Sequence, residues 1–427
     1  MSADLAAVDP ADPADPSVPL PGPTLDDIRA ARERLVGVVD VTPIQGSRYL
    51  EELLGAPVRL KVESLQRTGS YKIRGAYNRL SQLSPEERDR GVVAASAGNH
   101  AQGVALAARE LGIKATIFMP IGVALPKLQA TRGYGADVVL HGRVVDETLA
   151  AAGEFAERTG AVIIPPFDHH DVVAGQGTLA LEILEQVPDV ANVVVPIGGG
   201  GLIAGVASAF AQLEPEIGRR VRIIGVQAAN AAAYPPSLSA GEPVTIITSP
   251  TIADGIHVAR PGRLNFDLVQ RTVDTVVTVD DDDTARALLV LQERAKLVVE
   301  PAGAVGVGAA LAGSLRVEGT TVFLLSGGNI DPMVMERVIG RGLAASARYL
   351  KVRIPLPDIP GQLSTISAVI ADANANVVEV LHTRHGLGLQ ISEVSIEIHM
   401  ETRGQEHAEQ VLQHLREAGY RPYLDTV

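Results

Sequence analysis

The stretch VVVPIGGGGLIAG, residues 193–205, decides the class of fold. Three valines at 193–195 are typical of a buried strand, and the apolar residues from position 202 onward continue as a helix. The four glycines at 198–201 between them allow main-chain N–H groups to converge on an anion, and the helix dipole adds positive potential there. A phosphate is therefore the expected ligand, and a glycine-rich packing turn is the alternative.

Two common phosphate-binding loops do not fit this turn. No Lys-Ser or Lys-Thr pair follows the glycines, so the turn is not a Walker loop. Gly199, Gly201 and Ala204 match the loose dinucleotide fingerprint, but the next strand ends in Gln227, where a carboxylate that binds ribose is expected. This departure disfavours NAD as the ligand.

The sequence around this turn alternates between two kinds of segment. Short apolar runs rich in β-branched residues are separated by Ala-rich helical stretches, which predicts parallel sheets covered by helices. A first helix is expected to begin near Leu25, because Thr24 is a capping residue and acidic residues follow it. The expected strands occupy residues 58–62, 92–95, 115–119, 138–140, 193–196, 223–226 and 322–325.

Length and charge limit the possible functions. A chain of 427 residues predicts two or three domains. The net charge of -13 disfavours nucleic acid and anionic membranes as partners and favours small metabolites. The absence of cysteine excludes disulfides and thiolate chemistry and is compatible with a reducing cytoplasm, where we expect the protein to be. Residues 1–23 have no features of a signal peptide and predict a disordered tail.

Three further motifs carry polar groups at helix starts or strand ends. In RTGSYKIRGA, residues 67–76, a helix opens near Lys72, and its positive end together with Arg74 should disfavour the charged amine. In SAGNHAQG, residues 96–103, the N–H groups can receive a carboxylate and Asn99 can donate to a phenolate-like oxygen. In SGGN, residues 326–329, Ser326 follows a strand and faces the same crevice. Singly, each also fits a capped helix or a solvated surface turn.

Taken together and in this order, the four motifs resemble the fold-type II family of pyridoxal-phosphate (PLP) enzymes, and within it the threonine dehydratases. The resemblance covers residues 24–340, with a small subdomain at about 65–170 inserted in a larger one, each built on a parallel sheet. It implies that Lys72 holds the cofactor as a Schiff base and that Ser326 binds its pyridine nitrogen. It also implies that Asn99 binds the ring oxygen. The phosphate is expected at Gly198, Gly199, Gly200, Gly201 and Leu202, and the substrate carboxylate at Ser96, Ala97, Gly98, Asn99 and His100.

The last part of the chain, residues 346–427, predicts a separate module. Its pattern is strand (349–354), helix (361–371), two strands (377–382 and 390–399), helix (406–418) and a short final strand, a βαββαβ order that is ferredoxin-like. The opening DIPGQL, residues 358–363, and NANV, residues 374–377, resemble the ACT domain family, whose members bind amino acids beside the first turn. The resemblance implies an effector site at Pro360, Gly361, Gln362 and Leu363; a dimerisation domain without ligand is the alternative.

The family resemblance implies an activity. We expect deamination of L-threonine to 2-oxobutanoate and ammonia, with L-serine converted to pyruvate, as in isoleucine biosynthesis. We also expect an amino acid, of the branched-chain class, to regulate the activity. The protein is expected to form a homo-oligomer, either a dimer or a tetramer. A serine racemase-like enzyme fits less well, because Ala97 replaces a serine and the metal carboxylates of those enzymes map onto Gln227 and Ala233, so no metal is expected. A non-catalytic amino-acid sensor is the second alternative.

Overall fold

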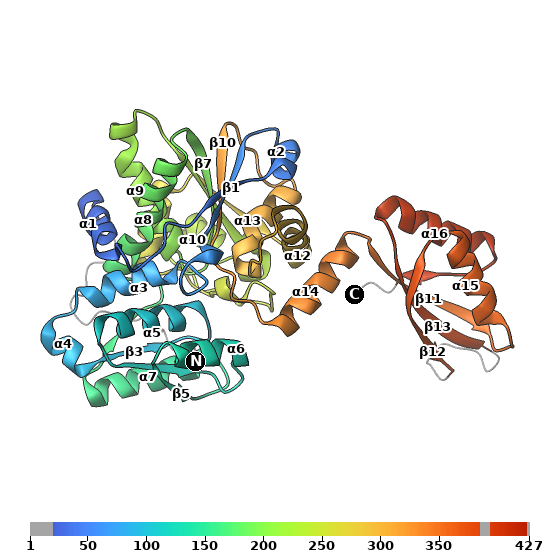
Figure 1. The fold of residues 1–427 in the computed structure, drawn as a ribbon, viewed down its shortest axis with the longest axis horizontal. Helices are drawn as coiled ribbons and strands as arrows, with labels where there is room; N and C mark the ends of the chain where they lie inside the picture. The colour runs from blue at the N-terminus through green and yellow to red at the C-terminus, as the bar shows by residue number, and fades with distance from the viewer. Residues whose placement is uncertain (1–19, 385–392, 425–427) are drawn as a thin grey trace. The chain divides into compact units, whose positions relative to one another are not determined.

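The computed structural model describes residues 20–384 and 393–424, and it divides into two compact units, residues 1–335 and 336–427 (Figure 1). The predicted tail falls mostly outside the described residues. Of its last four residues, Leu20 donates its main-chain N–H to Asp267 at 2.9 Å, and an added Cβ on Gly22 would meet Leu268 at 2.4 Å. The end of the tail therefore packs on the body of the first unit.

The larger sheet of the first unit has six strands in the order β1-β2-β10-β7-β8-β9. All neighbours are parallel except β1 and β2, which pair antiparallel. Figure 1 shows α8 and α9 on one side of this sheet and α12 and α13 on the other, which explains why its central strands are buried on both faces. The strands are β1 (Ile44–Gly46), β2 (Val58–Val62), β7 (Val190–Pro196), β8 (Arg222–Ala228), β9 (Thr275–Val279) and β10 (Thr320–Leu325).

The smaller sheet has four parallel strands in the order β5-β4-β3-β6. Its own core of buried apolar residues includes Ile73, Val104 and Ile117, separate from the core of the larger sheet. The first unit thus has two α/β subdomains, as the sequence predicted. The strands are β3 (Val92–Ala95), β4 (Ala115–Met119), β5 (Asp137–Leu140) and β6 (Val162–Ile163).

The helices of the first unit begin where local capping signals place them. Thr24 and Asp27 form a reciprocal capping box at the start of α1, which confirms the predicted start at Leu25. Asp280 caps α12 by accepting the N–H of Asp283 at 2.8 Å. The α-helices are α1 (Leu25–Leu35), α2 (Arg48–Leu54), α3 (Lys72–Ser81), α4 (Pro85–Arg90), α5 (Asn99–Leu111), α6 (Leu125–Gly133), α7 (Val145–Thr159), α8 (His170–Gln186), α9 (Gly201–Ile217), α10 (Tyr234–Ala240), α11 (Arg263–Thr272), α12 (Asp281–Val290) and α13 (Pro301–Leu311).

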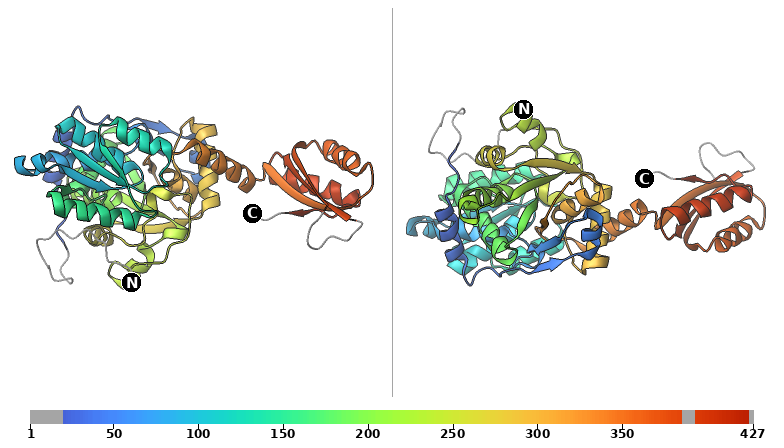
Figure 2. Two further views of the ribbon diagram at one scale, coloured as in Figure 1. Left: turned by 90° about the horizontal axis from the view of Figure 1, so that it is seen from below. Right: turned by 90° about the horizontal axis from the view of Figure 1, so that it is seen from above.

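The helix α14 (Pro332–Ala345) runs across the division between the two units, and the second unit then follows the predicted βαββαβ order. Its antiparallel sheet has the order β12-β13-β11-β14, and α15 and α16 pack on one face of that sheet (Figure 2). This is the ferredoxin-like arrangement. The start of the predicted strand at 390–399 lies outside the described residues. The elements are β11 (Tyr349–Pro357), α15 (Gln362–Asp372), β12 (Asn376–Thr383), β13 (Glu393–Glu401), α16 (Gln405–Glu417) and β14 (Tyr423–Leu424).

Candidate active site

The amine of Lys72 lies inside the first unit, at the first residue of α3. Its Nζ donates a hydrogen bond of 2.8 Å to the main-chain carbonyl of Pro166 and lies 5.4 Å from the centre of the Tyr71 ring. Burial lowers the pKa of Lys72 to about 8, while the nearby Glu300 carboxyl opposes this shift. The predicted direction is confirmed, but the expected contribution from Arg74 is wrong.

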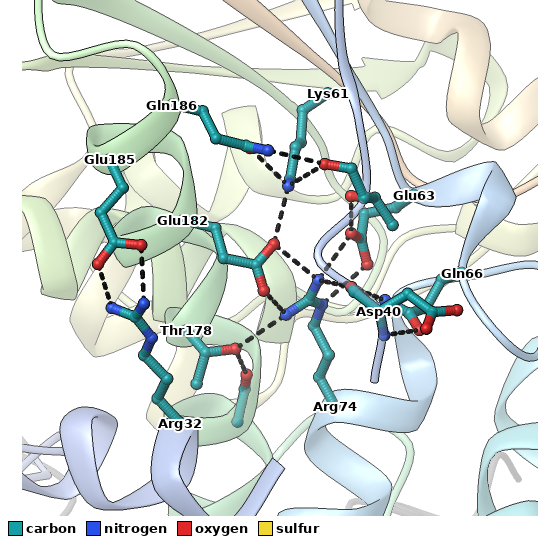
Figure 3. A network of polar contacts seen from close by, with 12 residues as sticks. Arg32, Asp40, Lys61, Glu63, Gln66, Arg74, Thr178, Glu182, Glu185 and Gln186 are labelled. Atoms are coloured by element: carbon teal, nitrogen blue, oxygen red, sulfur yellow. Dashed lines mark hydrogen bonds and ion pairs between the residues drawn. The ribbon is translucent and has the colours of Figure 1, made fainter. Parts of the chain in front are cut away.

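Arg74 does not act on Lys72 because two carboxylates neutralise it. Its guanidinium pairs with Glu63 at 2.8 Å and with Glu182 at 2.6 Å, and Lys61 Nζ lies 2.8 Å from the other oxygen of Glu182 (Figure 3). All four side chains are buried, and their two positive and two negative charges offset one another. This buried network ties the first turn of α3 to the end of β2 and to α8, and so fixes the backbone that carries Lys72.

The glycine turn lies between β7 and α9, as predicted. An added Cβ would lie 2.4 Å from the Phe167 ring at Gly199 and 1.9 Å from the Tyr234 hydroxyl at Gly200, and Gly200 has a φ of +100°. No side chain can therefore stand at these positions. The first N–H groups of α9 have no partner within the helix, so the turn presents main-chain donors and the positive end of a helix dipole.

Pro166 and Phe167 connect Lys72 with the glycine turn. Neither residue was predicted from the sequence to belong to the site. Pro166 accepts the hydrogen bond from Lys72, and the ring and main chain of Phe167 pack against Gly199 and Gly201. They follow β6, whose two residues give too short an apolar run to be recognised as a strand. The Pro-Pro pair at 165–166 was the available signal of a turn at this point.

The asparagine loop opens α5 and packs against the Lys72 segment. An added Cβ on Gly103 would lie 3.1 Å from the main-chain carbon of Lys72, so this close approach favours glycine. His100 donates its Nε2–H to the carbonyl of Ile164 at 2.9 Å, and burial, followed by the charge of Lys72, lowers the pKa of His100 to about 3. Ser96 Oγ accepts the N–H of Gly98 at 3.2 Å. His100 is thus a neutral, oriented imidazole.

The loop after β10, residues 326–329, contacts the residue before Lys72 and the start of α13. The main-chain carbonyl of the buried Ser326 accepts the N–H of Tyr71 at 3.1 Å. Gly327 accepts the N–H of Glu300 at 2.9 Å, and Glu300 Oε1 accepts from Asn99 Nδ2 at 2.7 Å. Burial, followed by the charge of Asp254, raises the pKa of Glu300 to about 7. The four predicted motifs therefore meet in one place, together with Glu300 of the segment EPAG, residues 300–303.

Two further polar segments of the first unit have structural roles. His169 caps α8 by accepting the N–H of Asp171 at 3.1 Å. Among residues 20–384 and 393–424, no group of three or more His, Cys, Asp or Glu side chains could hold a metal ion. The segment at 251–256 lies beside the glycine turn, because an added Cβ on Gly198 would meet Ile256 at 3.1 Å. Asp254 of this segment pairs with Lys127 of α6 at 2.9 Å.

The predicted effector turn lies at the surface of the second unit, before α15. Gly361 is the N-cap residue of this helix, with a φ of +94°, and its carbonyl accepts the N–H of Thr365 at 3.1 Å. Pro360, Gly361 and Leu363 are exposed and Gln362 is half-buried. The turn is thus accessible at the surface of its own unit.

Comparisons with known proteins agree with this assembly of motifs. Residues 36–327 match the family of pyridoxal-phosphate dependent enzymes, and residues 352–419 match the ACT domain. An L-threonine ammonia-lyase of Thermotoga maritima is 47% identical over 398 residues, which are 93% of this chain and 98% of that protein.

Solved structures are similar over the first unit. A processed threonine deaminase isoform from Solanum lycopersicum is 37% identical with a TM-score of 0.69, covering 76% of this chain and 96% of that one. A maize serine racemase is 34% identical with a TM-score of 0.70, covering 76% of this chain and 99% of that one. No helix among the described residues is long and apolar enough to cross a membrane. The chain therefore belongs to the fold-type II family of pyridoxal-phosphate dependent enzymes and carries an ACT domain at its carboxyl end.

Proposed function

We propose that this chain is a PLP-dependent L-threonine ammonia-lyase, which converts L-threonine to 2-oxobutanoate and ammonia and L-serine more slowly to pyruvate. The observation that carries the proposal is the position of the Lys72 amine. The Lys72 side chain is half-buried, desolvation lowers its pKa to about 8, and its amine is held by Pro166, whose neighbour Phe167 packs on the glycine turn. The similarity to the L-threonine ammonia-lyase of Thermotoga maritima and to the threonine deaminase of Solanum lycopersicum supports the choice of threonine.

The residues present fit PLP. The main-chain donors at Gly198, Gly199, Gly200, Gly201 and Leu202 suit a phosphate, because side chains are excluded at the glycines. Six buried side-chain polar atoms in the described part of the chain have no hydrogen-bond partner, and Ser70 Oγ and Asn265 Oδ1 are two of them. Ser70 is two residues before Lys72, and the amide of Asn265 donates to Gly199 at 3.1 Å. Polar atoms without partners at both places are compatible with a polar ligand between them.

Lys72 would hold the aldehyde carbon of the cofactor, Asn99 its ring oxygen and Ser326 its pyridine nitrogen. When bound, PLP supplies a conjugated ring that stabilises negative charge at the substrate Cα. The N–H groups of Ser96, Ala97, Gly98, Asn99 and His100 would orient the substrate carboxylate at the start of α5.

The amine of Lys72 performs the proton transfer in this proposal. Because burial brings its pKa near the working pH, Lys72 can take the α-proton in its neutral form and hold it as an ammonium. The C–O bond to the β-hydroxyl then breaks, the hydroxyl leaves as water with a proton supplied at the phosphate side of the site, and hydrolysis of the released enamine gives 2-oxobutanoate and ammonia. Ser326 has a hydroxyl rather than a carboxylate, so it does not favour a protonated pyridine nitrogen, and prompt loss of the β-substituent is favoured over racemisation.

The racemase alternative is weaker at two positions. Ala97 has no hydroxyl that could deliver a proton to the second face of the substrate. Gln227 stands where a metal carboxylate is expected, and its Oε1 instead accepts the main-chain N–H of Tyr234 at 2.9 Å. Ala233 at the second position has no metal-binding group. We therefore propose an enzyme without the divalent-metal site of the racemases.

We further propose that an amino acid, in the branched-chain class, binds near Pro360, Gly361, Gln362 and Leu363 and regulates the activity. A role in isoleucine biosynthesis, a cytoplasmic location and assembly as a homo-oligomer complete the proposal. The ACT match and the exposed turn before α15 support the amino-acid site.

The test is an assay of 2-oxo acid and ammonia release with L-threonine, L-serine and D-serine, with and without branched-chain amino acids. We expect L-threonine to be the best substrate, with a visible cofactor band that is absent in Lys72→Ala. A protein that binds PLP without colour would support the sensor alternative. Conversion of L-serine to D-serine at a rate comparable with ammonia release would support the racemase alternative.

A further inference from the structure

We propose that Asn329 and Glu300 are positioning residues that hold the side-chain amide of Asn99 in a single orientation. The inference rests on the proposed function, in which Asn99 donates to the ring oxygen of PLP. It assigns roles to the last residue of the SGGN motif and to a buried carboxyl group, neither of which is needed for the proton transfer by Lys72.

Asn329 has its orientation set by a main-chain group. Its Nδ2 donates to the carbonyl oxygen of Thr68 at 2.7 Å and to Oδ1 of Asn99 at 2.8 Å. A carbonyl oxygen can only accept, so the nitrogen of Asn329 must face Thr68. The same nitrogen therefore requires an acceptor from Asn99, and Oδ1 is the only acceptor in that side chain.

Glu300 holds the other end of the Asn99 amide. Its Oε1 accepts from Asn99 Nδ2 at 2.7 Å, and its own main-chain N–H is bonded to Gly327. Glu300 is 4% exposed and is the N-cap residue of α13, so a rigid element positions its carboxyl. With Oδ1 bound to Asn329 and one N–H bound to Glu300, a single N–H of Asn99 is left for another acceptor.

Two motif glycines leave room for these side chains. An added Cβ on Gly69 would lie 2.3 Å from Asn329 Oδ1, and one on Gly327 would lie 2.4 Å from Glu300 Oε1. Gly69 also has a φ of +69°, which disfavours other residues. The close packing at both ends indicates that Asn329 and Glu300 have little freedom to turn away from Asn99.

A flipped Asn99 amide would lose its contact with Asn329, because its N–H groups would face the donor of Asn329. Its oxygen would face the carboxyl of Glu300, which could donate to it only when protonated. Glu300 is buried and both asparagines are half-buried, so water could relieve these mismatches only in part. The arrangement therefore always offers a donor, which is the group that a phenolate-like oxygen requires.

The experiment uses the PLP-loaded, full-length enzyme and reads the absorption maximum of the bound cofactor, its titration with pH, and kcat/KM for L-threonine. Asn329→Asp replaces the donor by an acceptor of nearly the same shape, so Asn99 should flip. We expect a displaced absorption maximum, and kcat/KM should fall by about ten- to a hundredfold, the effect of one hydrogen bond to a charged group. Asn99→Ala should displace the band in the same direction.

Asn78→Asp is the matched control. Asn78 is buried in α3 and, like Asn329, donates its Nδ2 to a main-chain carbonyl, that of Asp171 at 2.7 Å, but it has no contact with Asn99. The band of Asn78→Asp should stay at the wild-type position. Glu300→Leu removes the acceptor for the Asn99 N–H and should displace the absorption band. Glu300→Gln keeps an acceptor oxygen, so its band should stay at the wild-type position.

The outcomes separate this inference from the proposed function. If wild-type protein loaded with PLP releases no 2-oxobutanoate, the proposed function fails before the variants are compared. If wild type is active and Asn329→Asp keeps the wild-type band, or Asn78→Asp displaces it equally, the positioning role is wrong. Should Asn329→Asp not fold, an unchanged band in Glu300→Leu would overturn the inference.

Discussion

The side-chain amine of Lys72 donates a 2.8 Å hydrogen bond to the main-chain carbonyl of Pro166, 94 residues further along the chain. The next residue, Phe167, packs its ring on Gly199. One short segment therefore contacts both the amine and the glycine turn. Since β6 ends just before this segment, the smaller sheet positions a contact between two elements of the site.

The first prediction concerns the pH dependence of cofactor capture. Burial lowers the pKa of Lys72 to about 8, so the neutral, nucleophilic fraction of its amine grows as the pH rises towards 8. The rate of PLP capture by cofactor-free protein should rise about tenfold per pH unit below that value and level off above it. Stopped-flow absorbance measures this rate. A rate that keeps rising to pH 10, as for a free lysine, would contradict the assigned pKa.

The second prediction concerns Glu300 and stability. Its pKa is about 7 in the folded protein against an ordinary 4.5, so the folded state binds the proton more tightly. The tighter binding of this proton stabilises the folded state. The stabilisation is complete below about pH 4.5 and is lost as the pH rises through about 7. The free energy of unfolding of wild type, minus that of Glu300→Gln, should fall by about 3 kcal/mol over this range.

Urea unfolding at several pH values tests this, with Glu86→Gln for comparison. Glu86 is exposed, and a main-chain hydrogen bond followed by one from Ser84 lowers the pKa of its carboxyl. The difference for Glu86→Gln should therefore change in the opposite sense, growing as the pH rises through the acid range. A Glu300→Gln difference that is the same at pH 4.5 and pH 7 would disprove the assignment.

The third prediction concerns the buried network around Arg74. Arg74→Met would leave Glu63 and Glu182 with a single buried cation, Lys61, and should lower the free energy of unfolding by about 3 to 5 kcal/mol. Arg29→Met is the control, because Arg29 pairs with Glu216 at the surface and should contribute no more than about 1 kcal/mol. Equal losses for the two variants would show that the buried network does not anchor α3.

Much of the fold could be predicted because local signals agree with the final structure. The strands β3 and β4 have the predicted bounds, and α3, α5 and α9 begin at Lys72, Asn99 and Gly201, where glycines and small polar residues precede them. The strands β1, β6 and β9 were missed. The first two are only three and two residues long, and β9 is mostly half-buried, so none gives the continuous apolar run of the central strands.

The site was predicted in its elements but not in its contacts. Glycines and a lysine at helix starts are visible in the sequence, whereas the approach of Pro166 to Lys72 depends on how β6 is placed in the smaller sheet. Arg74 shows the same limit. Its position two residues after Lys72 suggested that Arg74 lowers the pKa of the lysine amine. The guanidinium of Arg74 instead forms an ion pair with Glu182, which is 108 residues away in the sequence. Pairing across such distances follows from packing and not from local pattern.

The last prediction concerns the second unit, where Gly361 and Gly404 form a matched pair. Both are N-cap residues with positive φ, +94° at Gly361 and +110° at Gly404, and an added Cβ would meet no atom within 4 Å at either. Alanine at either position therefore strains the backbone, by about 1 to 2 kcal/mol, without a steric clash. Only Gly361 lies in the proposed effector turn. Gly361→Ala should weaken binding of the branched-chain effector, measured by calorimetry, while Gly404→Ala should retain the wild-type affinity. Equal weakening in both variants would assign the loss to general strain in the domain, and wild-type affinity in Gly361→Ala would place the effector elsewhere.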